Sequence, residues 1–391
     1  MAEGATLSHI ARPLALIRGL DRSRYRPLIA CAPWHAKWVR AEGLDPLPLD
    51  CRSSEEFLRA LETGRPVFDL LTLRRYAQND LRLLGRHRPD LVIGDFRLSL
   101  SVSARRARVP YAALANAHWS PAGGPRPWIR PVLSGWNWLP SAVLDVVGRA
   151  AWPLVERLHA APLNRLRREN GMAPLKPDLR WIYTEADHVL YADPPALYPD
   201  LRCPDRHRFL GAVLWSPEKN PAPGPRPGRE GERVYVALGS SGSPGSLDPL
   251  LRALEEWPCT AVVSTAGGPA PSGFPRAQFA PYWDGGEQSA GARLVVCNGG
   301  AGAVHQALAV GVPVLAVCRN LDQLLCMRAV EAAGAGRVLR EDRLTVQRIK
   351  AALREIWENP KMRAAAGRLS AGISVRETDA RFGAFLEEIF R

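Results

Sequence analysis

The seven cysteines of this 391-residue chain include no CxxC pair and no spacing typical of metal ligands. Their odd number, and the place of several of them in apolar segments, indicate buried, reduced thiols in a cytoplasmic protein. The N-terminus lacks a basic start followed by an apolar stretch, so no secretory signal peptide is expected. No stretch is long and apolar enough to cross a bilayer, since the nearest, "VLSGWNWLPSAVLDVVG", is interrupted by Pro140 and Asp145.

Acidic residues are outnumbered, with 39 Asp and Glu against 52 Lys and Arg and a formal net charge of +13. Such a balance suits nucleic acid, an anionic membrane surface or a phosphate-bearing small molecule. The basic residues are mostly arginines, scattered with no cluster longer than "RRARV" and no stripe with interleaved aromatics. A nucleic-acid partner is therefore disfavoured, because nucleic-acid-binding modules gather their basic residues.

The length favours two domains. In the first half, apolar runs at 27–33, 90–96 and 111–117 alternate with helix-like segments, as expected for parallel strands covered on both faces. Residues 120–170, rich in Trp and Pro, are expected to form long loops and short helices. Only three residues precede Gly4, whereas a strand needs about five, so the first strand should be shortened or missing.

A linker is predicted at 214–232, which is dense in Pro, Gly and charge. Four further apolar runs follow it, and they predict a second doubly wound α/β domain. They lie at 233–239, 260–265, 292–297 and 313–317. The expected organisation is an N-terminal domain over 1–213, the linker, a C-terminal domain over 233–375, and a helix over 376–391 that could pack back on the N-terminal domain.

Three glycines, Gly299, Gly300 and Gly302, stand behind Asn298 between a predicted strand and a predicted helix. In an open parallel sheet, ligands bind at the carboxyl ends of the strands, where glycines let the backbone approach and helix N–H groups attract anions. A phosphate is the expected guest. The turn is neither a P-loop, since no Lys-Ser/Thr follows, nor a dinucleotide fingerprint, since His305 replaces its last glycine. A tight connection with no ligand is the alternative.

The surrounding segment, "CNGGAGAVHQALAVGVPVLAV" followed by "NLDQLLCMRAVEAAGAG", resembles the donor-binding segment of GT-B glycosyltransferases. The match is to the UDP-glycosyltransferases, which include plant and bacterial natural-product enzymes. It rests on Gly299 and Gly300, "AL" at 307–308, "GVP" at 311–313 and Asp322-Gln323, with "VYVALGSSG" at 234–242 as the family's glycine–serine turn. The resemblance implies two Rossmann-like domains facing across a cleft, a nucleoside-diphosphate hexose as co-substrate, and neither a cofactor nor a metal.

The donor site that the resemblance implies departs from the family at two positions. Asn298 replaces a histidine that contacts the diphosphate, so a neutral hydrogen bond replaces a contact that could carry charge. Gln306 replaces a glutamate that holds the ribose hydroxyls, which keeps UDP the expected nucleotide but makes dTDP more plausible. For Asp322 and Gln323 the alternative is a helix cap with an exposed glutamine. The implied donor residues are Ser240, Ser241, Trp283, Asn298, Gly299, Gly300, Gly302, Ala303, Gln306, Asp322 and Gln323.

The stretch "EGATLSHIARPLALIRGL" resembles the family's first loop and helix, whose histidine would be His9. The resemblance implies that His9 is the general base that takes the proton of the acceptor hydroxyl, a task that suits histidine near neutral pH. It implies that Asp95, at a strand end, orients that base and stabilises its charged form. A helix cap is the alternative for each. Asn116, His118 and Trp119 are expected on the acceptor side, with a purely structural role equally open.

Together these features predict an inverting, metal-independent glycosyltransferase that acts on a hydroxyl of a small, aromatic or apolar acceptor. A lipid-acceptor transferase of the same fold, with the Trp-rich loops in peripheral contact with a membrane, is an alternative. Two others are a sugar-nucleotide epimerase or hydrolase and a binding protein without catalysis. The oligomeric state is left open by the sequence.

Overall fold

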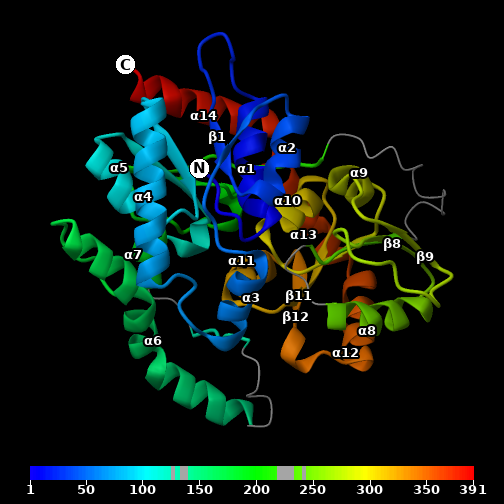
Figure 1. Ribbon diagram of the computed structural model, residues 1–391. Helices are drawn as coiled ribbons and strands as arrows, with labels where there is room; N and C mark the ends of the chain where they lie inside the picture. The colour runs from blue at the N-terminus through cyan, green and yellow to red at the C-terminus, as the bar shows by residue number, and fades with distance from the viewer. Residues whose placement is uncertain (125–127, 133–139, 218–232, 240–243) are drawn as a thin grey trace.

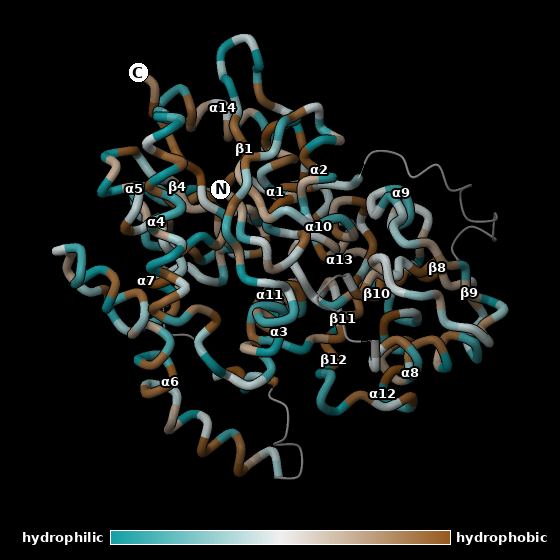
Figure 2. Tube along the Cα trace, in the orientation of Figure 1, coloured by the Kyte–Doolittle hydropathy of each residue, from teal (hydrophilic) through white to brown (hydrophobic). Residues whose placement is uncertain are grey.

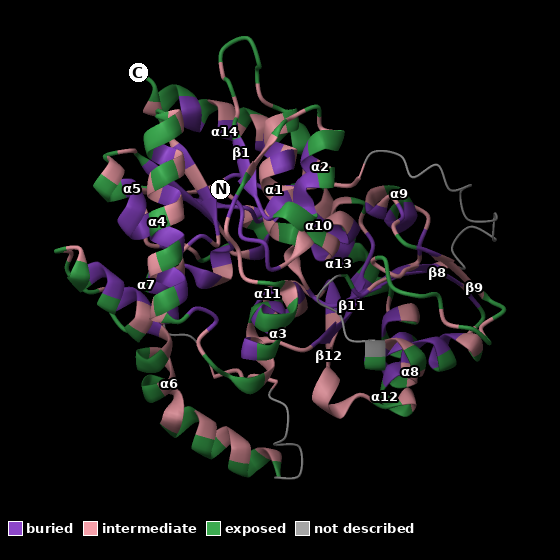
Figure 3. Cartoon of the chain, viewed as in Figure 1, coloured by how far each residue is buried: buried purple, intermediate pink, exposed green. Residues whose placement is uncertain are grey.

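The computed structural model comprises residues 1–391, of which 1–124, 128–132, 140–217, 233–239 and 244–391 are described. The predicted linker from 218 onward, and Ser240 and Ser241, lie outside the described residues. Two parallel sheets, one from each half of the chain, are covered by helices (Figure 1). Their strands form the buried interior of the molecule (Figure 3).

The N-terminal sheet comprises a four-stranded part in the order β3-β4-β5-β6 and a two-stranded part, β1-β2. All of its pairings are parallel. Parallel strands with both faces covered are what the continuous apolar runs predicted. The strands are β1 (Ile29–Cys31), β2 (Pro46–Pro48), β3 (Val92–Asp95), β4 (Tyr111–Ala115), β5 (His188–Tyr191) and β6 (His207–Phe209).

The first three residues connect these two parts. The Ala2 amide donates to the Ala30 carbonyl at 3.0 Å on one side. On the other side Ala2 forms a parallel bridge with Asp95, whose amide donates to the Met1 carbonyl at 3.0 Å. Residues 1–3 therefore form a short strand-like segment between β1 and β3, and the strand order reverses there, directly before the loop that bears His9.

The C-terminal sheet has six parallel strands in the order β12-β11-β10-β7-β8-β9. This order reverses between β7 and β10, and the carboxyl ends of two such strands form the crevice where ligands of open α/β sheets bind. Asn298 and the glycines follow β10 directly. The strands are β7 (Arg233–Ala237), β8 (Thr260–Ser264), β9 (Ala277–Ala280), β10 (Leu294–Cys297), β11 (Val314–Cys318) and β12 (Gly336–Arg340).

Fourteen α-helices are found in the described part of the chain, seven in each half. In the N-terminal half they are α1 (Leu7–Arg18), α2 (Ala36–Ala41), α3 (Ser54–Thr63), α4 (Leu70–His87), α5 (Leu100–Ala107), α6 (Ser141–Glu169) and α7 (Leu179–Tyr183). In the C-terminal half they are α8 (Pro244–Glu255), α9 (Gly285–Ala290), α10 (Ala301–Ala309), α11 (Leu321–Ala332), α12 (Val346–Trp357), α13 (Pro360–Ser370) and α14 (Val375–Ile389).

Two expectations from the sequence were wrong. The C-terminal sheet has two strands more than the four expected, because the edge strands β9 and β12 carry polar residues and lack a continuous apolar run. The long loops and short helices expected over 120–170 were wrong for residues 141–169, which form one 29-residue helix, α6. Its internal prolines, Pro153 and Pro162, each remove one backbone hydrogen bond, but the surrounding Ala, Leu and Arg residues favour helix strongly enough to continue it.

The last helix, α14, returns to the N-terminal half, so both ends of the chain lie there (Figure 1). Phe382, Phe385 and Leu386 are buried in one cluster with Leu16 of α1 and Leu190 of β5. Ion pairs between Arg208 and Glu388 and between Arg24 and Glu387 flank this contact. The two halves are thus connected by packing at the end of the chain as well as by the covalent link at its middle.

Candidate functional site

His9 and Asp95 form the core of the N-terminal part of the site. His9 lies in the first turn of α1 and Asp95 ends β3, which places both beside the strand-like segment of residues 1–3. The Nδ1 atom of His9 lies 2.7 Å from Oδ1 of the fully buried Asp95. A carboxylate at Nδ1 favours the tautomer that donates there, and Nε2 is then the nitrogen that can accept a proton. This is the arrangement expected of a base and its orienting partner.

Arg12, which sequence reasoning missed, shares Asp95 with His9. Its Nε and Nη2 atoms donate to both carboxylate oxygens of Asp95 at 2.8 and 2.5 Å, and its Nη1 donates to Asn116 at 2.8 Å. Burial alone would raise the pKa of Asp95, but the charges and hydrogen bonds of Arg12 and His9 hold it below its usual value. The signal available in the sequence was spacing, since positions 9 and 12 lie on one face of a helix.

The ring of Phe96 packs against the face of the His9 ring. The two rings are stacked with centroids 5.3 Å apart and an interplanar angle of 11°. Phe96 has a backbone φ of +53°, a left-handed conformation that costs a bulky residue about 1–2 kcal/mol. Such a conformation persists only where the surrounding structure enforces it.

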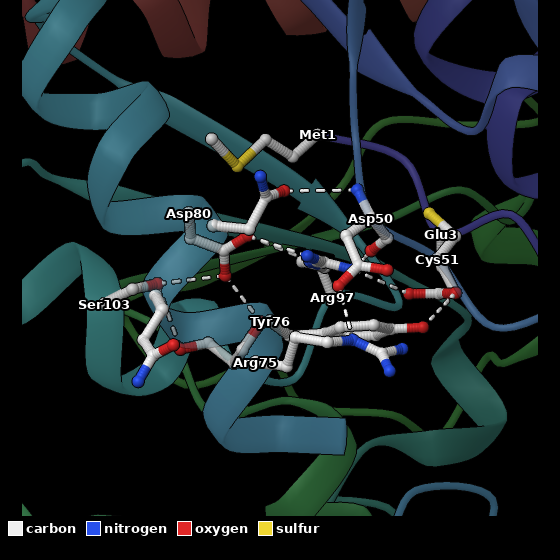
Figure 4. A network of polar contacts seen from close by, with 12 residues as sticks. Met1, Glu3, Asp50, Cys51, Arg75, Tyr76, Asp80, Arg97 and Ser103 are labelled. Carbon is white, nitrogen blue, oxygen red and sulfur yellow. Dashed lines mark hydrogen bonds and ion pairs between the residues drawn. The ribbon is translucent and has the colours of Figure 1, made fainter. Parts of the chain in front are cut away.

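The enforcing structure is a buried network around the next residue, Arg97 (Figure 4). Its guanidinium pairs with Asp80 at 2.9 Å and with Glu3 at 3.2 Å, and it lies 3.7 Å from the centre of the Tyr76 ring. Burial raises the pKa of Glu3 even beside Arg97. The network connects the strand-like segment of residues 1–3, α4 and the turn after β3, and so fixes the segment that carries Asp95 and Phe96.

The glycine-rich turn opens α10 at the switch point of the C-terminal sheet. Gly299 has a φ of +83°, and a Cβ there would lie 2.6 Å from the Cys318 sulfur, so only glycine fits. The Oδ1 atom of Asn298 accepts a hydrogen bond from the Gly300 amide at 2.9 Å. Gly302 is exposed, and a Cβ there would meet nothing within 4 Å. Packing explains Gly299, whereas Gly302 leaves open space where a phosphate would approach the helix.

Gln306 contacts the chain that leads out of the N-terminal half. Its Nε2 donates to the Trp215 carbonyl at 2.8 Å and to the Ser216 hydroxyl at 3.1 Å. Its Oε1 faces Gly285, where a Cβ would lie 2.2 Å away. Trp283 is buried nearby and donates through Nε1 to the Val263 carbonyl at 3.2 Å. The amide of Gln306 is thus engaged by protein groups.

Asp322 accepts hydrogen bonds from the opposite half of the molecule. The indole of Trp119 donates to its Oδ1 at 2.7 Å, and Nε2 of His118 lies 2.8 Å from the same atom. Burial alone would raise the pKa of Asp322, but His118, Trp119 and Arg12 hold it well below its usual range. His118 and Trp119, expected on the acceptor side, therefore also tie the two halves together.

The capping alternative for Asp322 and Gln323 was wrong. Asn320 caps α11 by accepting from the Gln323 amide at 3.0 Å, and the Gln323 side chain is buried. The Gln323 side-chain oxygen accepts from the Arg319 amide at 2.9 Å. Asp322 and Gln323 therefore lie in the first turn of α11, and the Gln323 side chain connects this turn to the loop before it.

Asp193 and His305 complete the polar contact between the halves, and nothing in the sequence pattern pointed to either role. Asp193 accepts from the Asn116 amide at 3.0 Å and from the Ala117 backbone amide at 2.7 Å. Its Oδ1 lies 3.5 Å from Nε2 of His305, a nitrogen without a hydrogen-bond partner in the described part of the chain. Burial lowers the pKa of His305, so the neutral form is favoured there.

One cavity of about 660 Å³ joins these groups. Its lining brings His9 of the N-terminal half and the glycine turn of the C-terminal half to the same space, while Asp95 lies buried behind His9. Most of the other lining side chains are apolar or aromatic, including Trp119, Trp128 and Trp152. Of the sequence-predicted residues, the lining includes His9, Asn116, Trp119, Trp283, Asn298, Gly300, Gly302, Ala303, Gln306, Asp322 and Gln323.

Neither a metal cluster nor a membrane span is found in the described ranges. They contain no group of three or more His, Cys, Asp or Glu side chains placed to hold a metal ion. They also contain no helix with the length and apolar character needed to cross a bilayer. All seven cysteines are free.

Residues 278–383 match the family model described as the C-terminal domain of erythromycin biosynthesis protein CIII-like proteins. The chain is 40% identical over 388 residues to a PGL/p-HBAD biosynthesis glycosyltransferase of Mycobacterium tuberculosis, with 95% of this chain and 87% of the relative covered. It is 42% identical over 383 residues to a PGL/p-HBAD biosynthesis rhamnosyltransferase of Mycobacterium bovis, with 95% and 82% covered.

Among solved structures, a Streptomyces glycosyltransferase complexed with thymidine diphosphate superposes with a TM-score of 0.70. The sequences are 17% identical, and the match covers 99% of this chain and 98% of the other. At that identity the likeness concerns the fold, which is the two-domain GT-B arrangement expected from the sequence.

Proposed function

The chain belongs to the family of GT-B glycosyltransferases that contains the mycobacterial PGL/p-HBAD biosynthesis enzymes, and from this premise we propose the details of its sugar transfer. It moves a hexose from a nucleoside diphosphate to an acceptor hydroxyl, with inversion at the anomeric carbon. The observation that carries this proposal is a cavity lined both by His9, whose Nδ1 contacts Asp95, and by the glycine turn at the start of α10.

The His9 side accounts for activation of the acceptor. The Nε2 atom of His9 takes the hydroxyl proton while the acceptor oxygen forms a bond to the anomeric carbon. Asp95 accepts a hydrogen bond from Nδ1–H of His9 and, without taking the proton, stabilises the imidazolium that forms, as in other base–carboxylate pairs. Arg12 keeps the buried Asp95 ionised, and the stacked Phe96 restricts the ring. Arg12 and Phe96 act through His9 and Asp95 and are positioning residues.

The α10 side accounts for departure of the leaving group. The bond between the anomeric carbon and the phosphate oxygen breaks, and the nucleoside diphosphate leaves with the electron pair. The backbone amides of the first turn of α10 and the helix dipole stabilise the charge that develops on the phosphate. Gly302 leaves room for that approach. In this proposal the base and the leaving group act on opposite sides of the sugar, which inverts the configuration at the anomeric carbon.

For the nucleotide we favour thymidine over the uridine expected from the sequence. A carboxylate at position 306 would hold ribose hydroxyls, but Gln306 is neutral and its amide already donates to Trp215 and Ser216. The missing carboxylate therefore costs a deoxyribose nucleotide less binding energy than a ribose nucleotide, which has one more hydroxyl to satisfy. The rhamnosyltransferase among the relatives and the thymidine diphosphate bound by the structural neighbour support the same choice and suggest a deoxyhexose.

The acceptor is proposed to present its hydroxyl on an apolar or aromatic body. The acceptor half of the cavity contains Trp119, Trp128, Trp152 and Tyr183, and few charged groups besides His9 and Arg12 lie there. Such surfaces bind aromatic or aliphatic ligands. The PGL/p-HBAD biosynthesis activity of the relatives suggests a pathway of the same kind for this chain.

A thermal-shift panel with UDP, thymidine diphosphate, GDP and ADP tests the donor site. A nucleotide at a hundred times its Kd should add roughly 2.7 kcal/mol of stability, and thymidine diphosphate should act at the lowest concentration. A stronger response to UDP would reverse the nucleotide assignment. No response to any of the four nucleotides would contradict the proposed donor site.

His9→Ala tests the base. Transfer should fall by about 10²–10⁴-fold while the thermal shift with nucleotide is kept, because His9 lies on the acceptor side. Unchanged transfer by this variant would show that another group takes the proton.

A further inference from the structure

The first part of α6 is a surface element with two different faces. None of the residues from 141 to 159 is buried, whereas Ala160 and Leu163 begin the section that packs into the core. The helix projects from the N-terminal half of the molecule (Figure 1). Its first part is therefore not held in place by burial in the protein core.

The inner face of this part forms a wall of the cavity. Gly148, Ala151, Trp152, Val155 and His159 all line it. Trp152 packs edge-on against Trp128 with ring centroids 5.7 Å apart. A molecule in the acceptor half of the cavity would therefore touch α6 from within.

The outer face exposes large aliphatic side chains. Val147, although 56% exposed, also lines the cavity, whereas Val143, Val146, Leu154 and Leu158 are 44%, 70%, 59% and 55% exposed. Their spacing of three, four or eight residues places them along one stripe of a helix. Apolar and polar residues alternate along α6 in Figure 2. Exposed apolar residues that are scattered singly are normal on a protein surface, whereas a continuous stripe of them indicates an interaction surface.

The exposed charges of α6 are mostly positive. They belong to Arg149, Arg157, Arg165 and Arg168 and, at the last position of the helix, to Glu169, which pairs with Arg165 and Arg74. The two other acidic residues of α6, Asp145 and Glu156, are only half-exposed, and Asp145 accepts from Trp128 and pairs with Arg130. The exposed surface of α6 thus combines aliphatic residues with an excess of cations.

We propose that the outer face of α6 docks on an anionic lipid surface, lying in the plane of the interface. A helix with an aliphatic stripe and flanking arginines has the composition of interfacial helices, in which the arginine stems lie along the apolar layer and the guanidinium groups bind lipid phosphates. A second copy of the chain fits this face less well, since two such helices would bring their arginines together.

This docking places the cavity wall at the lipid surface. If the proposed function holds, an apolar acceptor embedded in lipid can enter the cavity along the inner face of α6 without passing through water. The docking itself does not depend on the transferase assignment, because it rests on α6 alone.

Flotation of the purified full chain with lipid vesicles tests the proposal. The chain should float with vesicles of phosphatidylcholine mixed with phosphatidylglycerol, remain behind with phosphatidylcholine alone, and be released by high salt. The variants Val146→Gln/Leu154→Gln and Arg149→Gln/Arg157→Gln should each lower the bound fraction by about tenfold or more. Val375→Gln on α14 and Arg363→Gln on α13, which change exposed residues far along the chain, should float as the original chain does.

The melting temperature and the nucleotide thermal shift are measured on every variant. They should be unchanged, which separates loss of docking from loss of the fold or of the donor site. A chain that does not float with anionic vesicles, or α6 variants that float undiminished, would overturn the proposal. So would a dimer in solution that Val146→Gln/Leu154→Gln converts to a monomer, because the occupant would then be a second copy. Failure of nucleotides to bind would instead count against the proposed function alone.

Discussion

Arg12 donates to both carboxylate oxygens of Asp95, so the partner of His9 is itself paired with a cation. A buried carboxylate with only a histidine beside it would be driven toward its protonated form by desolvation. The arginine thus lets Asp95 remain ionised at a site where its exposed fraction is 0%.

Removing that cation should reverse the pH dependence that Asp95 confers on stability. With Arg12 present, the lowered pKa of Asp95 means that its contribution is complete above the unfolded value of 3.8 and is lost as the pH falls. In Arg12→Met, burial should raise the pKa of Asp95 above 3.8, so its contribution is present at low pH and is lost as the pH rises. The free energy of unfolding should fall by about 3–5 kcal/mol near neutrality.

Urea titrations of both proteins between about pH 4 and pH 7 measure this difference, which should widen as the pH rises. Arg381→Met, at an exposed ion pair on α14, is the matched control and should cost less than about 1 kcal/mol. A difference independent of pH would mean that Arg12 does not set the ionisation of Asp95.

Phe96→Leu should affect the chemical step and leave donor binding intact. Leucine keeps an apolar side chain at this position but removes the ring that stacks on His9. With the imidazole free to turn, kcat should fall by about tenfold, because small losses of alignment at the reacting group slow the reaction. Steady-state kinetics together with the nucleotide thermal shift check this, and a change in KM for the donor with kcat unchanged would contradict the positioning role.

Alanine substitutions at Gly299 and Gly302 should have different effects on stability, because the surroundings of the two glycines differ. Gly299→Ala places a Cβ 2.6 Å from the Cys318 sulfur at a φ of +83°, so we expect a loss of about 1–3 kcal/mol of stability. Gly302→Ala meets no atom within 4 Å and lies in a helix, where alanine is favoured over glycine by about 0.5–1 kcal/mol. Its stability should be equal or higher.

If Gly302 leaves room for a phosphate, Gly302→Ala should nevertheless bind the nucleotide more weakly. Calorimetric titration with thymidine diphosphate, beside thermal melts, measures both properties. A Gly302→Ala protein that is stable and binds nucleotide as before would show that the third glycine has no part in the phosphate approach.

Trp119→Phe should loosen the contact between the two halves while keeping the aromatic packing. It removes the indole N–H that donates to Asp322 at 2.7 Å, a hydrogen bond to a charged group worth about 1.5–3 kcal/mol. Because His118 still contacts Asp322, we expect the lower end of this range in the free energy of unfolding. Trp257→Phe is the control: its indole nitrogen has no partner among the described residues, so the same change should cost less there.

The sequence by itself determined the two doubly wound domains, because continuous apolar runs between helical segments can only be buried as parallel strands. It also pointed to the glycine turn, which follows a strand at the edge where ligands bind, while the resemblance to the glycosyltransferase family pointed to His9 and Asp95.

The tertiary structure decided what each of those residues contacts. Arg12, Asp193 and His305 gained their roles from contacts that the sequence does not show, since Arg12 and Asp193 meet Asn116, and His305 meets Asp193, only in the folded chain. Gln306 stood in a recognisable position, yet its hydrogen bonds to Trp215 and Ser216 depend on where the chain leaves the N-terminal half. The helix α6 was missed because its prolines resembled loop signals, and its exposed stripe exists only because the rest of the fold leaves that face uncovered.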